Sequence, residues 1–101
     1  MFGLEKLFKP TTGYKSLLQE GAIVIDVRSA AELDGGHVSG ARNICLDQLN
    51  SRLKELQKLN TPIITCCQSG ARSAMAAQIL KSAGTTAYNA GPWHSLQKQL
   101  I

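Results

Sequence analysis

Short runs of apolar residues punctuate the chain and predict buried strands. The β-branched run over residues 22–27 follows a glycine, and a weaker run occupies residues 41–45. A third run covers residues 62–66, with Pro62 at its entrance, where the missing N–H does least harm. A fourth strand is predicted over residues 85–89.

Apolar residues at helical spacing fill the intervals between these strands. Four leucines predict a helix over residues 47–58: Leu46, Leu49, Leu53 and Leu56. An Ala-rich helix is predicted over residues 72–82, with Lys81 and Gly84 near its end as dipole partner and C-cap. Three shorter elements are also predicted: a helix around Tyr14, Leu17 and Leu18, a turn over 29–34 capped by Ser29 and ended by Gly35-Gly36, and a terminal helix over 95–100.

The alternation of strands and helices predicts an α/β fold. We expect a mostly parallel central sheet flanked by helices on both faces. In such sheets, ligands bind at the carboxyl ends of the strands, where the following helices begin. The residues to search for chemistry are therefore those between a strand and the next helix.

The composition fits one small globular domain over residues 1–101, with residues 1–10 expected as a flexible N-terminal segment. The 101 residues are 44% hydrophobic and 18% charged, which is too apolar and too weakly charged for a disordered chain. The sequence contains no run of 18 apolar residues, so no transmembrane helix is predicted. The N-terminus also lacks the apolar centre of a signal peptide. Taken as complete, the chain is predicted to be cytoplasmic, with reduced thiols.

Charge is distributed unevenly along the sequence. The formal charge is +4, but residues 1–50 sum to −1 and residues 51–101 to +5. A basic half is able to attract nucleic acid or small anions. Its Lys and Arg residues are scattered, and aromatics make up only 5% of the chain, so no nucleic-acid partner is expected. The balance favours small anions or an acidic protein.

The three cysteines leave at least one thiol free or paired outside the chain, because their number is odd. With no Cys-x-x-Cys spacing and only two histidines, no metal site is expected. Cys66 is interpreted as a strand residue facing away from any site, with a resolving thiol as the alternative. Cys45 is interpreted as a core thiol.

The segment Cys67-Gln68-Ser69-Gly70-Ala71-Arg72-Ser73 joins a predicted strand to a predicted helix. Gly70 permits a positive φ, and such a turn points several N–H groups at one anion beside a helix N-terminus. A thiolate at Cys67 would be stabilised there as a nucleophile, and Arg72 would add a charge for an anionic substrate. The alternative is a buried structural cysteine before an ordinary turn. No histidine is placed to act as a base for Cys67. Reaction with a substrate that already contains sulfur would not require such a base.

Three motifs carry a family resemblance. They are Ile25-Asp26-Val27-Arg28 followed by Glu32, the segment Gly36-His37-Val38-Ser39-Gly40-Ala41-Arg42-Asn43-Ile44, and Cys67-x-x-Gly70-x-Arg72-Ser73. In this order and spacing, the chain resembles the rhodanese-like sulfurtransferase domain over about residues 12–95. The expected fold is therefore rhodanese-like.

The resemblance implies a sulfurtransferase. Cys67 would take up a sulfane sulfur as a persulfide and pass it to a thiophilic acceptor. The substrate-binding residues would be Gln68, Ser69, Gly70, Ala71, Arg72 and Ser73, whose amides surround the outer sulfur. The donor would be a small sulfur-containing anion, and the acceptor a small thiol or a protein. A monomer that needs no cofactor, metal or membrane is expected.

The resemblance also assigns supporting roles. Asp26, Arg28 and His37 would brace the loops around the site, with direct substrate contact as the alternative for the first two and acid–base chemistry for His37. Trp93 would pack beneath the end of the domain or line the mouth of the site. Relatives that use thiosulfate well often carry a second basic residue where this chain has Gln68.

Two rival functions remain open at this stage. Counted from Cys66, the loop has the Cys-x5-Arg spacing of phosphatases, so an arsenate reductase or phosphatase-like enzyme is one alternative. Cys67 is favoured, because the six residues from Cys67 to Arg72 match the sulfurtransferase loop and Thr65 stands where phosphatases carry His. A sulfur carrier without turnover is the other alternative, because it would keep Cys67 too.

Overall fold

The computed structural model describes residues 13–101. Residues 1–10, expected as a flexible segment, lie outside the described residues. The helices are α2 (Tyr14–Gln19), α3 (Ala30–Leu33), α4 (Leu46–Leu49), α5 (Leu53–Leu59), α6 (Ala71–Ser82) and α7 (Trp93–Leu100), with a 3-10 turn, η1 (Asn50–Arg52), between α4 and α5. The strands are β1 (Ile23–Asp26), β2 (Arg42–Asn43), β3 (Ile63–Cys67) and β4 (Ala87–Pro92).

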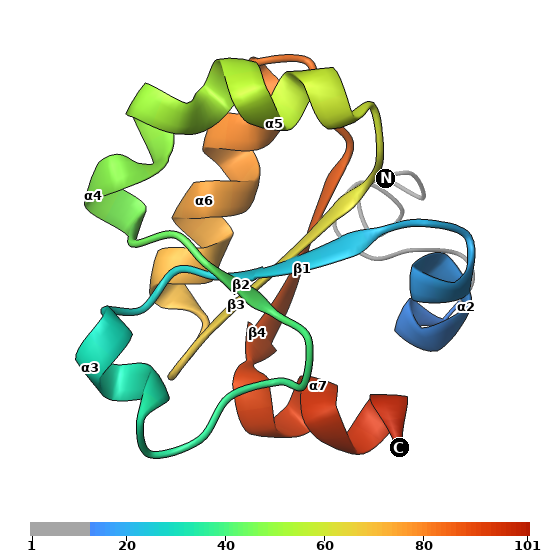
Figure 1. Cartoon of the computed structure of the whole chain (residues 1–101), viewed down its shortest axis with the longest axis vertical. Helices are drawn as coiled ribbons and strands as arrows, with labels where there is room; N and C mark the ends of the chain where they lie inside the picture. Colours follow the sequence, from blue (N-terminus) through green and yellow to red (C-terminus); the bar gives the residue numbers. More distant parts are fainter. Residues whose placement is uncertain (1–12) are drawn as a thin grey trace, which may run out of the picture.

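The strands of this part of the chain form one sheet in the order β2-β1-β3-β4, and every neighbouring pair is parallel. Helices α4, α5 and α6 lie on one side of the sheet, and α2 and α7 lie on the other (Figure 1). The predicted α/β fold with helices on both faces is therefore confirmed. All carboxyl ends of the strands meet at one edge.

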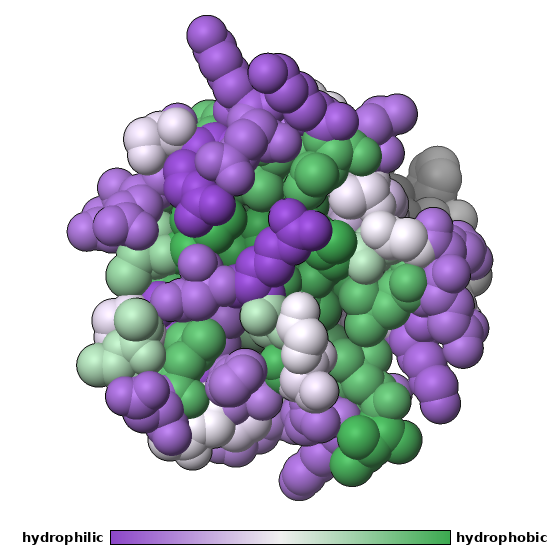
Figure 2. Space-filling model, in the orientation of Figure 1, coloured by the Kyte–Doolittle hydropathy of each residue, from purple (hydrophilic) through white to green (hydrophobic). Residues whose placement is uncertain are grey.

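The core consists of two apolar layers, one on each face of the sheet. On one face Ile25 and Ile63 pack with Leu80 of α6, and on the other Val24 and Ile64 pack against α2 and α7. A strand covered on both faces needs a continuous apolar run, which is why β1 and β3 were visible in the sequence. On the face shown in Figure 2, hydrophilic side chains cover much of the surface, with hydrophobic residues between them.

The predicted helix over residues 47–58 is wrong as a single element. The segment divides into α4, η1 and α5. At the break, the Ser51 hydroxyl donates a hydrogen bond to the carbonyl of Gln48 at 2.8 Å. Serine side chains that bond the nearby backbone compete with regular helix, which is consistent with the tighter turn at this point.

The last strand lies further along the chain than the sequence predicted. It covers Ala87–Pro92 rather than residues 85–89, and α7 begins at Trp93 rather than at residue 95. Asn89, Gly91 and Pro92 favour turns over strands. β4 tolerates them because it pairs with β3 alone in the described sheet, where a missing N–H costs least. In the structure, the end of β4 lies beside the loop that follows β3, because a Cβ at Gly70 would lie 3.4 Å from the Cα of Gly91.

No helix within residues 13–101 has the length and apolar character needed to cross a membrane.

Candidate active site

Cys67 is the last residue of β3 and lies at the carboxyl edge of the sheet. The chain then turns through Gln68 and Ser69 and enters α6 after Gly70, the N-cap, whose φ is +104°. A side chain at position 70 would be strained by this backbone and would meet the Cα of Gly91 at 3.4 Å. The glycine therefore permits the tight turn that folds the loop back over the cysteine.

The Cys67 sulfur lies within reach of several donors from this loop. The Gly70 N–H donates to Sγ at 3.0 Å, and the hydroxyl of Ser73 lies 3.3 Å from Sγ. The same hydroxyl lies 3.1 Å from the Gly70 carbonyl, and it can rotate between the two. Thr65 fixes this first turn of α6 through a buried hydrogen bond to the carbonyl of Ser73 at 2.8 Å. The loop thus presents donors toward one sulfur atom.

These contacts determine the acidity of the Cys67 thiol. Burial raises its pKa, but hydrogen bonds from the Ser73 hydroxyl and from the backbone N–H groups of Ser73, Gly70 and Ser69 outweigh burial. The net result is a pKa below the ordinary value of a thiol. The N-terminus of α6 adds a positive dipole end at the same point. A larger thiolate fraction at neutral pH follows.

We therefore expect iodoacetamide to alkylate Cys67 with a pH midpoint below that of an ordinary cysteine. The reactive thiolate persists as the pH falls until the lowered pKa is reached. Replacing Ser73 with Ala removes a donor to the sulfur and should move the midpoint to higher pH. Mass spectrometry with fragmentation, which separates Cys67 from its neighbour, gives the two curves. Identical midpoints in both proteins would show that Ser73 does not stabilise the thiolate.

Cys66 lies on the opposite face of the sheet, because successive residues of a strand point to opposite sides. It is fully buried and packs in the layer with α2 and α7, whereas Cys67 packs in the layer with α6. Burial first, and nearby Asp26 second, raise the pKa of Cys66 to about 12. Cys45 is partly buried, and its thiol donates to the carbonyl of Arg28 at 3.4 Å.

Asp26 and Arg28 form a buried ion pair at the end of β1. The Arg28 guanidinium donates to both Asp26 carboxylate oxygens at 2.8–3.1 Å, and the two residues are 2% and 0% exposed respectively. Arg28 also donates to the carbonyl of Gly36 at 2.8 Å, and its charge lies 5.2 Å from the centre of the Trp93 ring. The pair thus joins the end of β1 to the loop after α3 and to the start of α7.

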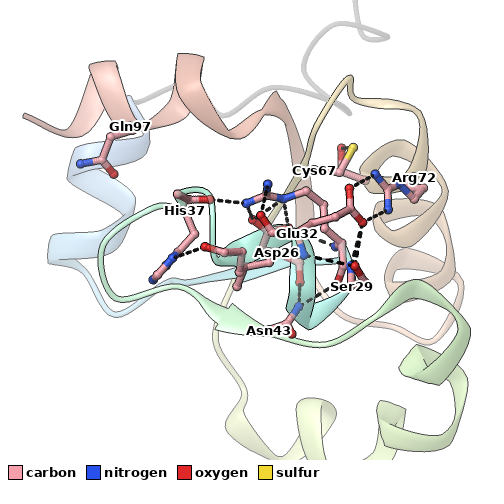
Figure 3. A network of polar contacts seen from close by, with 12 residues as sticks. Asp26, Ser29, Glu32, His37, Asn43, Cys67, Arg72 and Gln97 are labelled. Atoms are coloured by element: carbon pink, nitrogen blue, oxygen red, sulfur yellow. Dashed lines mark hydrogen bonds and ion pairs between the residues drawn. The ribbon is translucent and has the colours of Figure 1, made fainter.

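Glu32 connects α3 to the cysteine loop (Figure 3). Its carboxylate accepts two hydrogen bonds from the Arg72 guanidinium, at 2.8 and 2.9 Å, and one from the Ser29 N–H at 3.0 Å. Arg72 and then Ser29 hold the pKa of Glu32 at about 2. Arg72 is therefore already paired in the structure, whereas the sequence suggested a cation directed at the substrate.

The remaining residues predicted for the site lie in three kinds of place. Gln68 and Ser69 are exposed on the loop, and Ala71 is exposed at the start of α6. His37 is exposed, with Nδ1 3.3 Å from the carbonyl of Leu33, and points away from the cysteine (Figure 3). Trp93 packs over Gly36, where a Cβ would meet its ring at 2.6 Å. Trp93 is the first residue of α7 and packs against the core layer beside α2 and α7.

Sequence reasoning gave no role to Glu32 or to Asn43. The Asn43 side chain donates to the carbonyls of Asp26 and Arg28, at 3.0 and 2.8 Å, and so fixes β2 to the end of β1. Glu32 had a readable signal, because Ser29-x-x-Glu32 is a capping box, and the structure contains it. Its pairing with Arg72, forty positions away, had no local signal.

The described residues contain no group of three His, Cys, Asp or Glu side chains that could hold a metal ion. A surface hollow of about 810 Å³ lies along α6 beside the exposed Met75. Near the cysteine itself, the chemistry available is that of a stabilised thiolate, a ring of N–H donors and a paired arginine.

The fold and the site together define a class, a parallel α/β domain with a cysteine of lowered pKa at the carboxyl end of a strand. Comparison with known proteins identifies the family within this class. Residues 11–94 match the rhodanese-like domain model, and the chain belongs to this family.

Relatives include proteins named as enzymes and as carriers. Thiosulfate sulfurtransferase GlpE of Pseudomonas fluorescens is 32% identical over 76 residues, which cover 74% of this chain and 68% of the relative. The putative sulfur carrier protein YrkF of Bacillus subtilis is 37% identical over 65 residues, 64% of this chain and 35% of the relative. The uncharacterized protein YqhL of the same organism is 46% identical over 65 residues, 64% of this chain. The chain covers about half, 51%, of YqhL.

Solved structures share the fold. The human single domain sulfurtransferase TSTD1 superposes with a TM-score of 0.68 and 33% identity, covering 83% of this chain and 88% of its own. Reduced CoADR-RHD of Bacillus anthracis gives a TM-score of 0.77 and 29% identity, over 96% of this chain and 18% of that protein. The comparisons support membership of a family of sulfurtransferases and sulfur carriers.

Proposed function

We propose that this protein is a sulfurtransferase that moves sulfane sulfur through a persulfide on Cys67. The observation that carries the proposal is the sulfur environment: the Gly70 N–H at 3.0 Å and the Ser73 hydroxyl at 3.3 Å from Sγ. A persulfide is a large and soft anion, so a ring of N–H donors at a helix N-terminus suits it. The sulfurtransferase names of relatives support the same reaction.

The chemistry needs only this chain and two substrates. The Cys67 thiolate attacks the outer sulfur of the donor, and the donor's S–S bond breaks with its electron pair leaving on the remaining fragment. A new S–S bond joins Sγ to the transferred sulfur, whose negative charge faces the loop amides. A nucleophilic acceptor, cyanide in an assay or a small or protein thiol, then removes the outer sulfur and restores the thiolate. The donor, acceptor and oligomeric state stay predictions.

Cys67 rather than Cys66 is the proposed nucleophile. The Cys66 thiol is buried on the opposite face of the sheet, with a pKa of about 12, so it offers almost no thiolate at neutral pH. This disfavours the Cys-x5-Arg interpretation and with it the phosphatase-like and arsenate-reducing alternatives. Asp26 and Arg28 act in this proposal as supports of the site. His37 does so too, because its ring contacts the backbone of Leu33.

A sulfur carrier without turnover is the second candidate, and the likeness to the putative carrier YrkF favours it. Steady-state assays separate the two functions. We expect repeated cycles of thiocyanate formation when a sulfane-sulfur donor and cyanide are both in excess over the protein. A single equivalent of thiocyanate per protein, followed by no further product, would favour the carrier. Absence of any transfer with several donors would contradict both.

A further inference from the structure

The side-chain charges around Cys67 cancel in pairs. Residues 67–73 contain one cation, Arg72, and both of its terminal nitrogens bond the two oxygens of the Glu32 carboxylate. Two further charged groups at this edge, Asp26 and Arg28, are paired with each other at 2.8 Å. Residues 67–73 therefore bring no unpaired cation to the site. Once Cys67 ionises, these five groups together carry one negative charge.

Glu32 is held in this position by more than its arginine. Its carboxylate accepts hydrogen bonds from the N–H and hydroxyl of Ser29, at 3.0 and 3.1 Å, which close the capping box at the start of α3. With a pKa of about 2 it stays ionised at neutral pH. An anion that seeks Arg72 must share it with this carboxylate or break a bidentate pair, the strongest common geometry for such a contact. The pKa of Arg72 is raised, first by its hydrogen bonds to Glu32 and to a smaller extent by the charge of Cys67.

We infer that Glu32 determines which donors the site accepts, by disfavouring dianions such as thiosulfate relative to donors that carry a single charge. The inference rests on the proposed function, because it concerns loading of Cys67 with sulfur. Repulsion between a fixed carboxylate and an incoming anion scales with the charge of the anion. Thiosulfate carries two negative charges in one small ion, so its repulsion from the carboxylate is about twice that of a monoanion. Glu32 is on this account a specificity-determining residue that acts through Arg72.

Two sulfur donors with the same reacting S–S bond but different charges test this inference. Thiosulfate transfers its outer sulfur to the thiolate and releases sulfite: Cys–S⁻ + S–SO₃²⁻ gives Cys–S–S⁻ + SO₃²⁻. Methanethiosulfonate, a monoanion with the same S–S bond, gives Cys–S–S⁻ and methanesulfinate in the same way. In each case one S–S bond forms and one breaks, with the electron pair leaving on the departing sulfur group. No oxidant, reductant or proton is consumed.

The test is the rate of loading with each donor, followed by the mass gain of the intact protein at constant ionic strength. Glu32→Gln removes the charge but keeps a side chain that serves in a capping box. We expect this variant to raise the ratio of the thiosulfate rate constant to the methanethiosulfonate rate constant about five- to tenfold, since one charge at close range acts on a donor with one extra charge. The excess should shrink as salt is added.

Two further variants serve as matched controls. Glu55→Gln makes the same change in net charge, but it breaks an exposed pair between Glu55 of α5 and Arg52 of η1 rather than a contact with the loop. We expect its ratio to equal that of the wild type. Glu32→Asp keeps the charge with a shorter side chain, and its ratio should stay within about twofold of the wild type, because Coulomb repulsion depends on charge and weakly on an ångström of distance.

The outcomes distinguish a failure of the role of Glu32 from a failure of the proposed function. A wild-type protein that loads from either donor, with the same ratio in Glu32→Gln, overturns the role of Glu32 and leaves the proposed function intact. An equal rise in Glu55→Gln or in Glu32→Asp overturns it too, by assigning the effect to net charge or to loop geometry. A wild-type protein that gains sulfur from neither donor overturns the proposed function and this inference with it.

Discussion

Replacing Cys67 with Ser is expected to lower the rate of sulfur transfer to cyanide by roughly a thousandfold or more, because a serine hydroxyl is a poor nucleophile without an adjacent base. A hydroxyl also cannot form the S–S bond on which the proposed reaction depends. The loop should survive the change, since Ser can accept the Gly70 N–H bond now made to Sγ. Thiocyanate formation, measured colorimetrically with methanethiosulfonate as donor, gives the rate.

Cys66→Ala is the matched control, because it removes the adjacent thiol from the opposite face of the sheet. We expect its rate to stay within about threefold of the wild type, because the lost sulfur packs in the other core layer from Cys67 and only a small cavity is left. Cys45→Ser should behave in the same way. A loss of activity in Cys66→Ala, with Cys67→Ser still active, would show that Cys66 is the nucleophile. The phosphatase-like Cys-x5-Arg spacing would then be the relevant one.

Replacing Asp26 with Ala is expected to destabilise the protein by about 3–5 kcal/mol, the usual cost of leaving one member of a buried ion pair without its partner. Arg28 is 2% exposed, so its charge has almost no access to water. Asp26 accepts the hydrogen bonds from the Arg28 backbone and guanidinium that fix the end of β1. For a chain of 101 residues, such a loss approaches the whole stability of a small domain. Urea denaturation followed by circular dichroism measures it.

The exposed pair of Arg52 and Glu55 provides the comparison. Their side chains are 41% and 57% exposed, so Glu55→Gln should cost less than about 1 kcal/mol. The double variant Asp26→Ala with Arg28→Met should recover much of the stability lost in Asp26→Ala, since the uncompensated charge is gone. If Asp26→Ala were as mild as Glu55→Gln, the pair would not hold this edge of the sheet together.

The sequence predicted best where one physical rule determined the outcome. Strands β1 and β3 are covered on both faces and therefore appear as continuous apolar runs. Helix α6 has a glycine at its N-cap and Ala-rich turns, and its predicted limits differ from the observed ones by one residue. The sequence favoured Cys67 over Cys66 by the length of the loop, and strand alternation accounts for the two thiols lying on opposite faces of the sheet.

The rest depended on tertiary contacts that no local pattern contains. β4 includes Asn89, Gly91 and Pro92, which favour turns, and it is a strand because β3 offers it a partner. The pairing of Glu32 with Arg72 joins the first turns of two helices, α3 and α6, which the parallel sheet brings to one edge. A sequence reading therefore assigned Arg72 a free charge that the fold neutralises.

The central claim, that Cys67 carries the transferred sulfur, is tested most directly by mass spectrometry of the loaded protein. After incubation with methanethiosulfonate and removal of excess donor, the wild-type chain should gain one sulfur atom, about 32 Da, as a persulfide. Fragmentation should place that sulfur on Cys67, and cyanide should remove it. The same gain in Cys67→Ser, or a sulfur located on Cys66, would contradict the account.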